Sequence, residues 1–197
     1  MVRARRPGGG VFFYPRGGYG RISERLADAV VAAGGEIRLG SAVTRVDVAG
    51  LPSLSTPEAR LDVDVVLSTM PVAGLARAIT PAPPADVANA LARLRTRAMV
   101  LVYLVVPRPR YTPFDAHYLP DPDIHTSRLS EPKTYRDGDD PADRTVLCAE
   151  LPCWVDDETW RASADELGAR VADEVVRSGL PAPCLLYTSD AADEWLR

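Results

Sequence analysis

Lysine is nearly absent from this chain. Lys133 is the only lysine among its 23 basic residues. The 23 basic and 27 acidic residues leave a net charge of −4, which argues against a nucleic-acid-binding protein. The one basic cluster, Arg3, Arg5 and Arg6, is too short to bind a polyanion, and we expect it to be a terminal segment without a binding role.

Cysteine and histidine are also scarce. Cys148 and Cys153 have no zinc-like spacing, so we expect buried free thiols in a reducing cytoplasm. His117 and His125 have no cysteine or carboxylate at the spacing of a metal site, and we interpret both as ordinary polar residues. The sequence therefore predicts no bound metal.

Long apolar runs are missing as well. The run Ala98–Val106 is far too short to cross a bilayer, so no transmembrane segment is predicted. Its valine and leucine content predicts a strand buried on both faces. No signal peptide is visible, and nothing in the sequence specifies an oligomeric state.

The most informative stretch that is present runs from Tyr14 to Val46, YPRGGYGRISERLADAVVAAGGEIRLGSAVTRV. Its first glycines predict a turn, and Ser23 is a candidate N-cap. Apolar residues then recur at helical spacing, which predicts one buried helix face. These positions are Leu26, Ala29, Val30 and Ala33. Gly34 and Gly35 predict the helix end, and alternation at Ile37 and Leu39 predicts a strand.

Further alternation predicts strands over residues 43–48 and 61–67, and Pro81, Pro83 and Pro84 suggest a domain boundary. Beyond it we predict a helix at Ala85–Leu94, the strand at Ala98–Val106 and a long polar loop. A strand at Thr145–Leu151 and a helix capped by Ser163 follow, with Leu167, Val171 and Val175 on one face. The fold class is α/β (α+β).

The segment Tyr14–Val46 resembles the point in the amine-oxidase, protoporphyrinogen-oxidase and phytoene-desaturase superfamily of flavoproteins where the chain returns from the substrate domain to the FAD domain. Val63–Pro71, VDVVLSTMP, resembles the strand of that family that ends beside the flavin. The resemblance implies part of an FAD-binding Rossmann-like domain over residues 1–80 and part of a mixed-sheet substrate domain over residues 81–183.

Carried onto this sequence, the resemblance implies that Ser68, Thr69, Met70 and Pro71 lie near the cofactor, FAD. It implies that the backbone of Val43 meets the adenine edge. The fingerprint G-x-G-x-x-G of the family is absent from the chain, so we assign no pyrophosphate site. We therefore expect this chain by itself to bind FAD poorly.

The loop Phe114–Tyr135 resembles a stretch of UDP-galactopyranose-mutase-like flavoproteins in which an aromatic strand leads to an arginine. It suggests that Arg128 binds a carboxylate or phosphate, and that Tyr118 and Tyr135 stack on a small-molecule substrate or donate hydrogen bonds to it. The alternative is a surface ion pair of Arg128 with nearby acids. These acids are Asp121, Asp123 and Glu131.

No catalytic residue is predicted. Asp156, Asp157 and Glu158 precede a short helix, where acids favour the helix dipole, and this structural interpretation is preferred to a catalytic pair. No Ser-His-Asp or Cys-His set can be assembled.

Three functions remain open at this point. The first is a fragment of an FAD-dependent oxidoreductase that oxidises or desaturates a small organic substrate by hydride transfer to flavin. The second is a UDP-galactopyranose mutase-like flavoprotein without net redox change, and the third is a cofactor-free α+β binding module. For a fragment with uncovered apolar faces we expect aggregation.

The segment Cys184–Glu194, CLLYTSDAADE, resembles the in-frame translation of a transposon adapter used in sequencing libraries. We therefore predict that residues 184–197 are an artefactual tail and that the natural sequence stops near Ala182 or Pro183. The alternative is a genuine C-terminal helix over Ser189–Arg197. The resemblance of Tyr14–Val46 to an internal part of the family implies that Met1 is an internal methionine of a longer protein.

Overall fold

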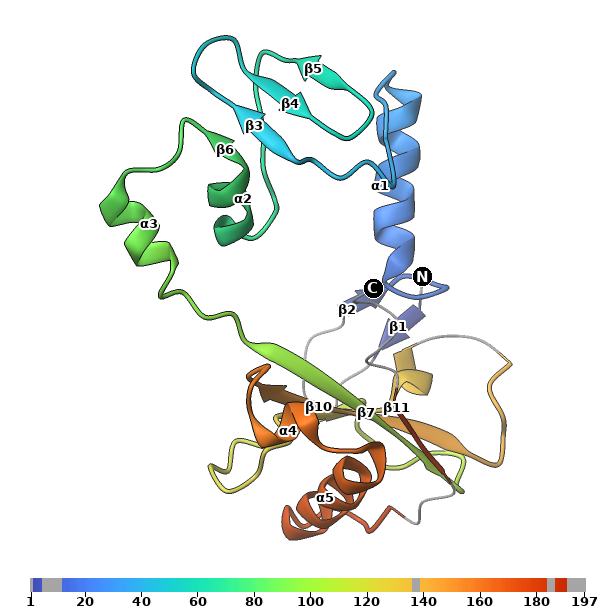
Figure 1. The fold of residues 1–197 in the computed structure, drawn as a ribbon. Coiled ribbons are helices and arrows are strands. Elements are labelled where there is room, and N and C mark those ends of the chain that lie inside the picture. The colour runs from blue at the N-terminus through green and yellow to red at the C-terminus, as the bar shows by residue number, and fades with distance from the viewer. Residues whose placement is uncertain (1, 5–11, 136–138, 184–186, 191–197) are drawn as a thin grey trace. The chain divides into compact units, whose positions relative to one another are not determined.

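A computed structural model describes residues 2–4, 12–135, 139–183 and 187–190 of the chain (Figure 1). The chain divides into two compact units. Unit 1 comprises Met1–Asp28 and Arg97–Arg197, and unit 2 comprises Ala29–Thr96. The predicted division into parts of an FAD-binding domain (residues 1–80) and of a substrate domain (residues 81–183) stays a prediction.

Unit 1 is built on two long antiparallel strands, β7 (Ala98–Val106) and β10 (Thr145–Cys153), which pair along their whole length. The five-stranded sheet has the order β11-β7-β10-β9-β8. Its short strands are β8 (Ala116–Tyr118), β9 (Arg128–Ser130) and β11 (Tyr187–Asp190). A separate pair, β1 (Val2–Ala4) and β2 (Phe12–Tyr14), belongs to the same unit.

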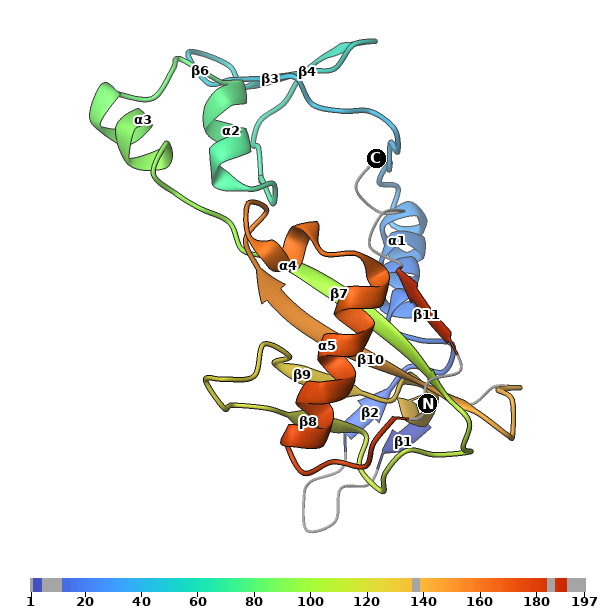
Figure 2. The same cartoon turned by 60° about the horizontal axis from the view of Figure 1, so that its bottom comes forward.

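The core of unit 1 lies between one face of this sheet and helix α5 (Ala164–Arg177), which crosses that face (Figure 2). Because side chains alternate along a strand, every second residue of β7 points to this core. The buried residues of β7 are Val100, Val102, Leu104 and Val106. Leu167, Val171 and Val175 of α5 cover them and are at most 3% exposed.

The ends of α5 follow the sequence signals. Ser163 accepts a hydrogen bond from the backbone N–H of Glu166, and the Glu166 carboxylate accepts one from the backbone N–H of Ser163, which completes a capping box. After the helix, Gly179 adopts a positive φ of 76°, and the N–H of Leu180 donates to the carbonyl of Val175. The predicted N-cap and core face of this helix are confirmed.

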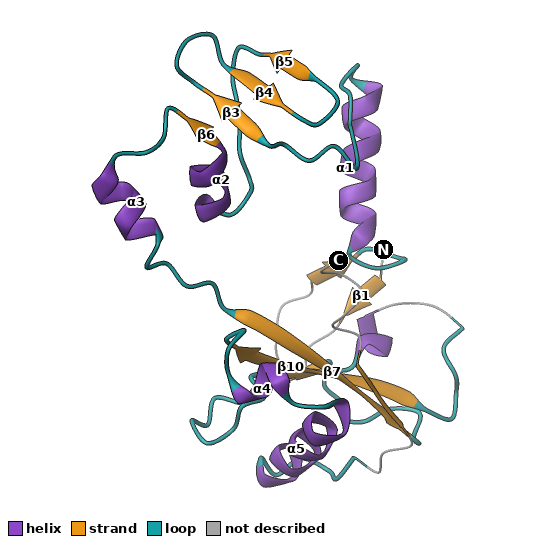
Figure 3. Ribbon diagram, viewed as in Figure 1, coloured by secondary structure: helices purple, strands orange, loops and turns teal. Residues whose placement is uncertain are grey.

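Unit 2 contains a small four-stranded sheet and two short helices (Figure 3). The strands are β3 (Arg45–Asp47), β4 (Ser53–Ser55), β5 (Arg60–Asp62) and β6 (Ile79–Thr80), in the order β5-β4-β3-β6. The helices are α2 (Val72–Ala78) and α3 (Ala85–Leu91). Val46 of β3 is 4% exposed and is the one buried large apolar side chain of this unit among the described residues.

Helix α1 (Gly20–Ala32) forms where predicted but does not bury an apolar face. Its end has the predicted glycine geometry, since Gly34 has a φ of 85° and the N–H of Gly35 donates to the carbonyl of Val30. Ser23 lies inside the helix, because the helix already begins at Gly20 after the positive-φ glycines, so its predicted N-cap role is wrong. Leu26 and Val30 are 63% and 45% exposed, which corrects the predicted burial.

Two predicted strands are largely missing from unit 2. Residues 36–38 have no regular structure, and of the segment 61–67 only Leu61 and Asp62 belong to a strand, β5. Leu39 and Leu67 are each 91% exposed. An apolar strand needs both a hydrogen-bonding neighbour and a cover for its side chains. Val63 still donates its backbone N–H to the carbonyl of Pro52 at 2.9 Å, but the described residues provide no cover for the side chains of Leu39 and Leu67.

The second half of the chain corrects two smaller expectations, and one further feature concerns the predicted tail. β7 is buried on one face and only half-buried on the other, because α5 covers a single face. The predicted polar loop between β7 and β10 contains β8, β9 and the 3₁₀ turn η1 (Pro132–Tyr135). Residues 187–190 of the predicted artefactual tail form β11 on the edge of β7, although backbone pairing of this kind places few demands on sequence.

The mixed helices and sheets confirm the predicted α/β (α+β) class. None of the helices in the described ranges has both the length and the apolar character that a bilayer crossing requires.

Two buried carboxylates accept hydrogen bonds from loop residues of unit 1 and so hold these loops against its core. Glu174 of α5 is 2% exposed and accepts hydrogen bonds from the backbone N–H groups of His125 and Thr126 at 3.0 and 2.9 Å. Glu131 accepts one from the N–H of Tyr111 at 3.1 Å and one from the hydroxyl of Thr145 at 2.7 Å. Burial raises the pKa of Glu174, but its hydrogen bonds outweigh this effect, and the net pKa lies below the ordinary value of 4.5.

We predict that α1 tolerates a charge where α5 does not. Val30→Lys is expected to change the free energy of unfolding by less than about 0.5 kcal/mol and to reduce aggregation, because Val30 is already exposed. The matched control Val175→Lys is expected to cost about 3 kcal/mol or more, because Val175 is fully buried. Urea unfolding and size-exclusion chromatography measure both effects, and an equal loss in the two variants would contradict the description of α1.

We predict that Glu174 makes unit 1 sensitive to acid. A carboxylate whose pKa is lower in the folded than in the unfolded state stabilises the folded state at pH values above its unfolded pKa. This contribution to stability is lost as the pH falls through the folded pKa. Glu174→Gln is expected to cost about 2 kcal/mol at neutral pH, and the difference from the unaltered chain should shrink below pH 4.5. Urea unfolding across this range tests the prediction, which a pH-independent difference would refute.

Candidate functional site

A pocket in unit 1 is lined mainly by tyrosine rings and has a volume of ≈ 360 Å³. The residues that line it are Tyr14, Tyr19, Tyr118, Arg128, Ser130, Pro132 and Tyr135. All three residues predicted to bind the substrate, Tyr118, Arg128 and Tyr135, are therefore brought together. Their role in substrate binding stays a prediction.

The sheet register explains why these side chains meet. Tyr118, the last residue of β8, pairs directly with Arg128, the first residue of β9. Ser130 lies two residues further along β9, and so its side chain points to the same face of the sheet as that of Arg128. Pro132 and Tyr135 follow in η1 and line the same pocket.

Arg128 forms an ion pair with Glu150, which lies directly opposite it on β10. The Nε of Arg128 donates to Oε1 of Glu150 at 2.9 Å, and its Nη2 donates to the same oxygen. The hydrogen bond with Glu150 is the main cause that raises the pKa of Arg128, and a second hydrogen bond with Tyr118 adds to it. The side chains of Tyr118, Arg128 and Glu150 thus form one row of polar groups across the neighbouring strands β8, β9 and β10.

Two of the three acids that the sequence suggested as ion-pair partners of Arg128 bind other groups, and Arg128 pairs with Glu150 instead. Glu131 is buried against Tyr111 and Thr145, as described above. Asp121 accepts a hydrogen bond from the backbone N–H of Asp123 at 2.9 Å within the turn between β8 and β9. Glu150 was not singled out from the sequence, although it is a charged residue in the middle of an otherwise apolar strand.

Two further tyrosines complete the pocket. The ring of Tyr14 stacks on that of Tyr135 with a centroid separation of 5.5 Å and meets the ring of Tyr19 edge-on at 5.2 Å. The hydroxyl of Tyr135 donates to the carbonyl of Asp115 at 3.1 Å, which fixes its position. Tyr14 and Tyr19 flank the predicted glycine turn, and this aromatic pair was not predicted from the sequence.

The histidines and cysteines of the described residues point to no metal or nucleophile chemistry. Burial lowers the pKa of His117 against the opposing effect of Glu131, which favours the neutral ring. Burial raises the pKa of the Cys148 thiol and that of the Cys153 thiol. Within the described ranges no three or more histidine, cysteine or acidic side chains converge to hold a metal.

The acids before α4 (Glu158–Arg161) have a structural role. Asp157 is the N-cap and accepts hydrogen bonds from the backbone N–H groups of Trp154 and Trp160 at 2.8 and 2.9 Å. These two hydrogen bonds are the main causes that lower the pKa of Asp157. Glu158 lies in the first helical turn. The structural interpretation of these acids is confirmed for both residues.

The residues predicted to contact the cofactor lie in unit 2. Ser68, Thr69 and Met70 form an exposed irregular segment that ends at Pro71, the N-cap of α2. In the described part of the chain the backbone N–H groups of Ser68, Thr69 and Met70 donate to no backbone carbonyl. Val43 is 38% exposed and lies two residues before β3. Exposed backbone groups of this kind fit the proposed contacts with a flavin, which stay a prediction.

We predict that Arg128 and Glu150 are energetically coupled. A double-mutant cycle with Arg128→Met and Glu150→Gln is expected to give a coupling of about 1 kcal/mol, because Glu150 is only 19% exposed. The exposed pair Arg177 and Asp173 on α5 provides the control cycle, for which we expect no measurable coupling. Urea unfolding supplies the free energies, and equal couplings in the two cycles would contradict the prediction.

The fold is shared with several solved structures. Reduced UDP-galactopyranose mutase has a TM-score of 0.70 and 16% identity over 91% of this chain. A redesigned putrescine oxidase has a TM-score of 0.66 and 18% identity over 91%. An oxidoreductase from Methanosarcina mazei has a TM-score of 0.64 and 19% identity over 89%. This chain spans only 40%, 40% and 43% of those three proteins, respectively.

No curated protein matches the chain. The profile of the flavin-containing amine oxidoreductases matches residues 2–192, a range that extends into the predicted artefactual tail. Because this match spans nearly the whole sequence, the chain belongs to the family of flavin-containing amine oxidoreductases.

Proposed function

We propose that this chain is part of an FAD-dependent oxidoreductase that removes hydride from a small organic substrate. The observation that carries the proposal is the tyrosine-lined pocket, which gathers Tyr118, Arg128 and Tyr135 in a member of a flavin-containing family. Because the chain spans about 40% of similar flavoproteins, we assign the activity to a longer protein of which this chain is a part.

The backbone of Ser68, Thr69, Met70 and Pro71 would hold the flavin, and the backbone of Val43 would meet its adenine. A bound flavin supplies the hydride-accepting chemistry, so the protein needs mainly to position a substrate. The tyrosine rings of the pocket can enclose the substrate and exclude water, and the Arg128 guanidinium can orient one of its polar groups. The buried free thiols Cys148 and Cys153 support a reducing compartment, the cytoplasm.

A flavin measurement on the intact protein tests the proposal. The purified protein is expected to show flavin absorbance and to release FAD on denaturation. Thr69→Pro removes one backbone donor and is expected to weaken flavin binding about tenfold, equivalent to about 1.4 kcal/mol. Asp64→Pro lies in the same exposed segment and is the matched control, for which we expect full flavin content. Absence of flavin from the intact protein would overturn the function.

A second candidate is a mutase that acts on a nucleotide sugar without net redox change. It is favoured by the guanidinium of Arg128 inside the pocket, since arginine binds phosphate oxygens well, and by the similarity to reduced UDP-galactopyranose mutase. Turnover of a sugar nucleotide only after chemical reduction of the flavin would identify the mutase. Reduction of the flavin by an organic substrate would identify the oxidoreductase.

A further inference from the structure

The turn between β8 and β9 connects two residues of the tyrosine-lined pocket. Tyr118 ends β8 immediately before this turn, and Arg128 begins β9 immediately after it. The turn comprises residues 119–127 and is closed by a hydrogen bond from the N–H of Leu119 to the carbonyl of Ser127 at 3.1 Å. A displacement of the turn would therefore move both pocket residues.

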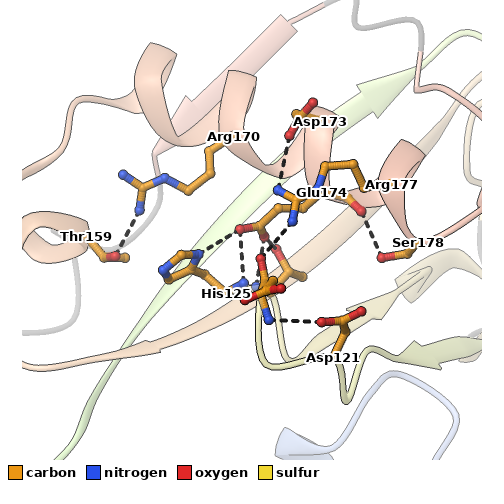
Figure 4. Close-up of polar contacts among 10 residues, drawn as sticks. Asp121, His125, Thr159, Arg170, Asp173, Glu174, Arg177 and Ser178 are labelled. Carbon is orange, nitrogen blue, oxygen red and sulfur yellow. Dashed lines mark hydrogen bonds and ion pairs between the residues drawn. The ribbon is translucent and has the colours of Figure 1, made fainter.

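Helix α5 binds this turn through hydrogen bonds to one buried carboxylate, that of Glu174. Besides the two backbone N–H groups described above, Glu174 accepts hydrogen bonds from the hydroxyl of Thr126 at 2.7 Å and from the ring Nδ1 of His125 at 3.0 Å (Figure 4). Thr126 is fully buried and lies two residues before Arg128. Four donors on two consecutive residues thus converge on a single side chain.

A second residue of α5 holds the same turn. Nη2 of Arg177 donates to the carbonyl of Asp123 at 2.9 Å. Arg170, two helical turns closer to the N-terminus of α5, instead donates to the hydroxyl of Thr159 at 2.9 Å and so contacts α4 (Figure 4). The two arginines therefore form comparable contacts from one helix to different segments.

Ser127, the last residue of the turn 119–127, connects the turn to the Arg128–Glu150 ion pair of the pocket. Ser127 donates to the carbonyl of Glu150 through its backbone N–H at 2.8 Å and through its hydroxyl at 3.0 Å. Glu150 in turn binds the guanidinium of Arg128. Hydrogen bonds therefore connect Glu174, through Thr126 and its neighbour Ser127, to Glu150, which binds Arg128.

We propose that Glu174 is a positioning residue of the pocket, which fixes the turn 119–127 and thereby sets Arg128 against Glu150 and Tyr118. This inference rests on the proposed function only for the role of the pocket, because the connection itself is a property of unit 1. The carboxylate of Glu174 is suited to this task, since an ionised carboxylate is acceptor-only and faces four donors. A glutamine at this position would present its own donor group to those donors.

The experiment measures the Arg128–Glu150 coupling in different backgrounds of the full chain. The double-mutant cycle of Arg128→Met and Glu150→Gln is repeated in chains that carry Glu174→Gln, Arg177→Met or Arg170→Met. Glu174→Gln is expected to reduce the coupling by at least half, and Arg177→Met by a smaller fraction. Arg170→Met should leave it unchanged, although it also removes a hydrogen bond of α5.

A purely structural role of Glu174 would lower the stability of every variant equally and leave the coupling unchanged, which would overturn the proposal. An equal loss of coupling with Arg170→Met would overturn it too. If Glu174→Gln prevents folding, the proposal is tested by comparing the Arg128–Glu150 coupling in Arg177→Met with that in Arg170→Met. Both arginines are replaced in the same way, so a smaller coupling in Arg177→Met alone supports the proposal and equal couplings overturn it. None of these outcomes depends on flavin content, so the proposed function stands or fails separately.

Discussion

The antiparallel pairing of β7 with β10 is the constraint on which the rest of unit 1 depends. The two strands pair over nine residues each, and this register assigns every side chain to one of two faces. Leu147, Ala149 and Leu151 point to the core under α5, whereas Cys148 and Glu150 point to the opposite face. A slip of one residue would exchange the two sets, placing Glu150 in the core and the leucines in the pocket face.

The same pairing explains which parts of the fold could be predicted from sequence. β7, β10 and α5 have strong apolar periodicity and are covered by one another, so pattern and burial agree. Helix α1 and the segments around Leu39 and Leu67 also have apolar patterns, yet these side chains are exposed. A pattern shows that a face is suited to burial, but burial requires a partner, and the described residues do not provide one for these segments.

The candidate site was only partly predictable for a related reason. Arg128, Tyr118 and Tyr135 lie within one short stretch of sequence, where their resemblance to a flavoprotein motif could be recognised. Glu150 meets Arg128 only through the register of β9 on β10, and the rings of Tyr14 and Tyr19 come from the first residues of the chain. Contacts between residues so far apart in sequence depend on the assembled fold and leave no local pattern.

The Arg128–Glu150 pair also bears on the choice between the two candidate reactions. An anionic group, such as the diphosphate of a nucleotide sugar, would have to compete with the Glu150 carboxylate for the guanidinium or add to an already compensated pair. An uncharged substrate needs no such exchange and can use the tyrosine rings and the remaining donors of Arg128 as they stand. The observed pairing is therefore more compatible with an uncharged substrate group beside Arg128 than with an anionic one, and in this respect it supports the proposed oxidoreductase over the mutase.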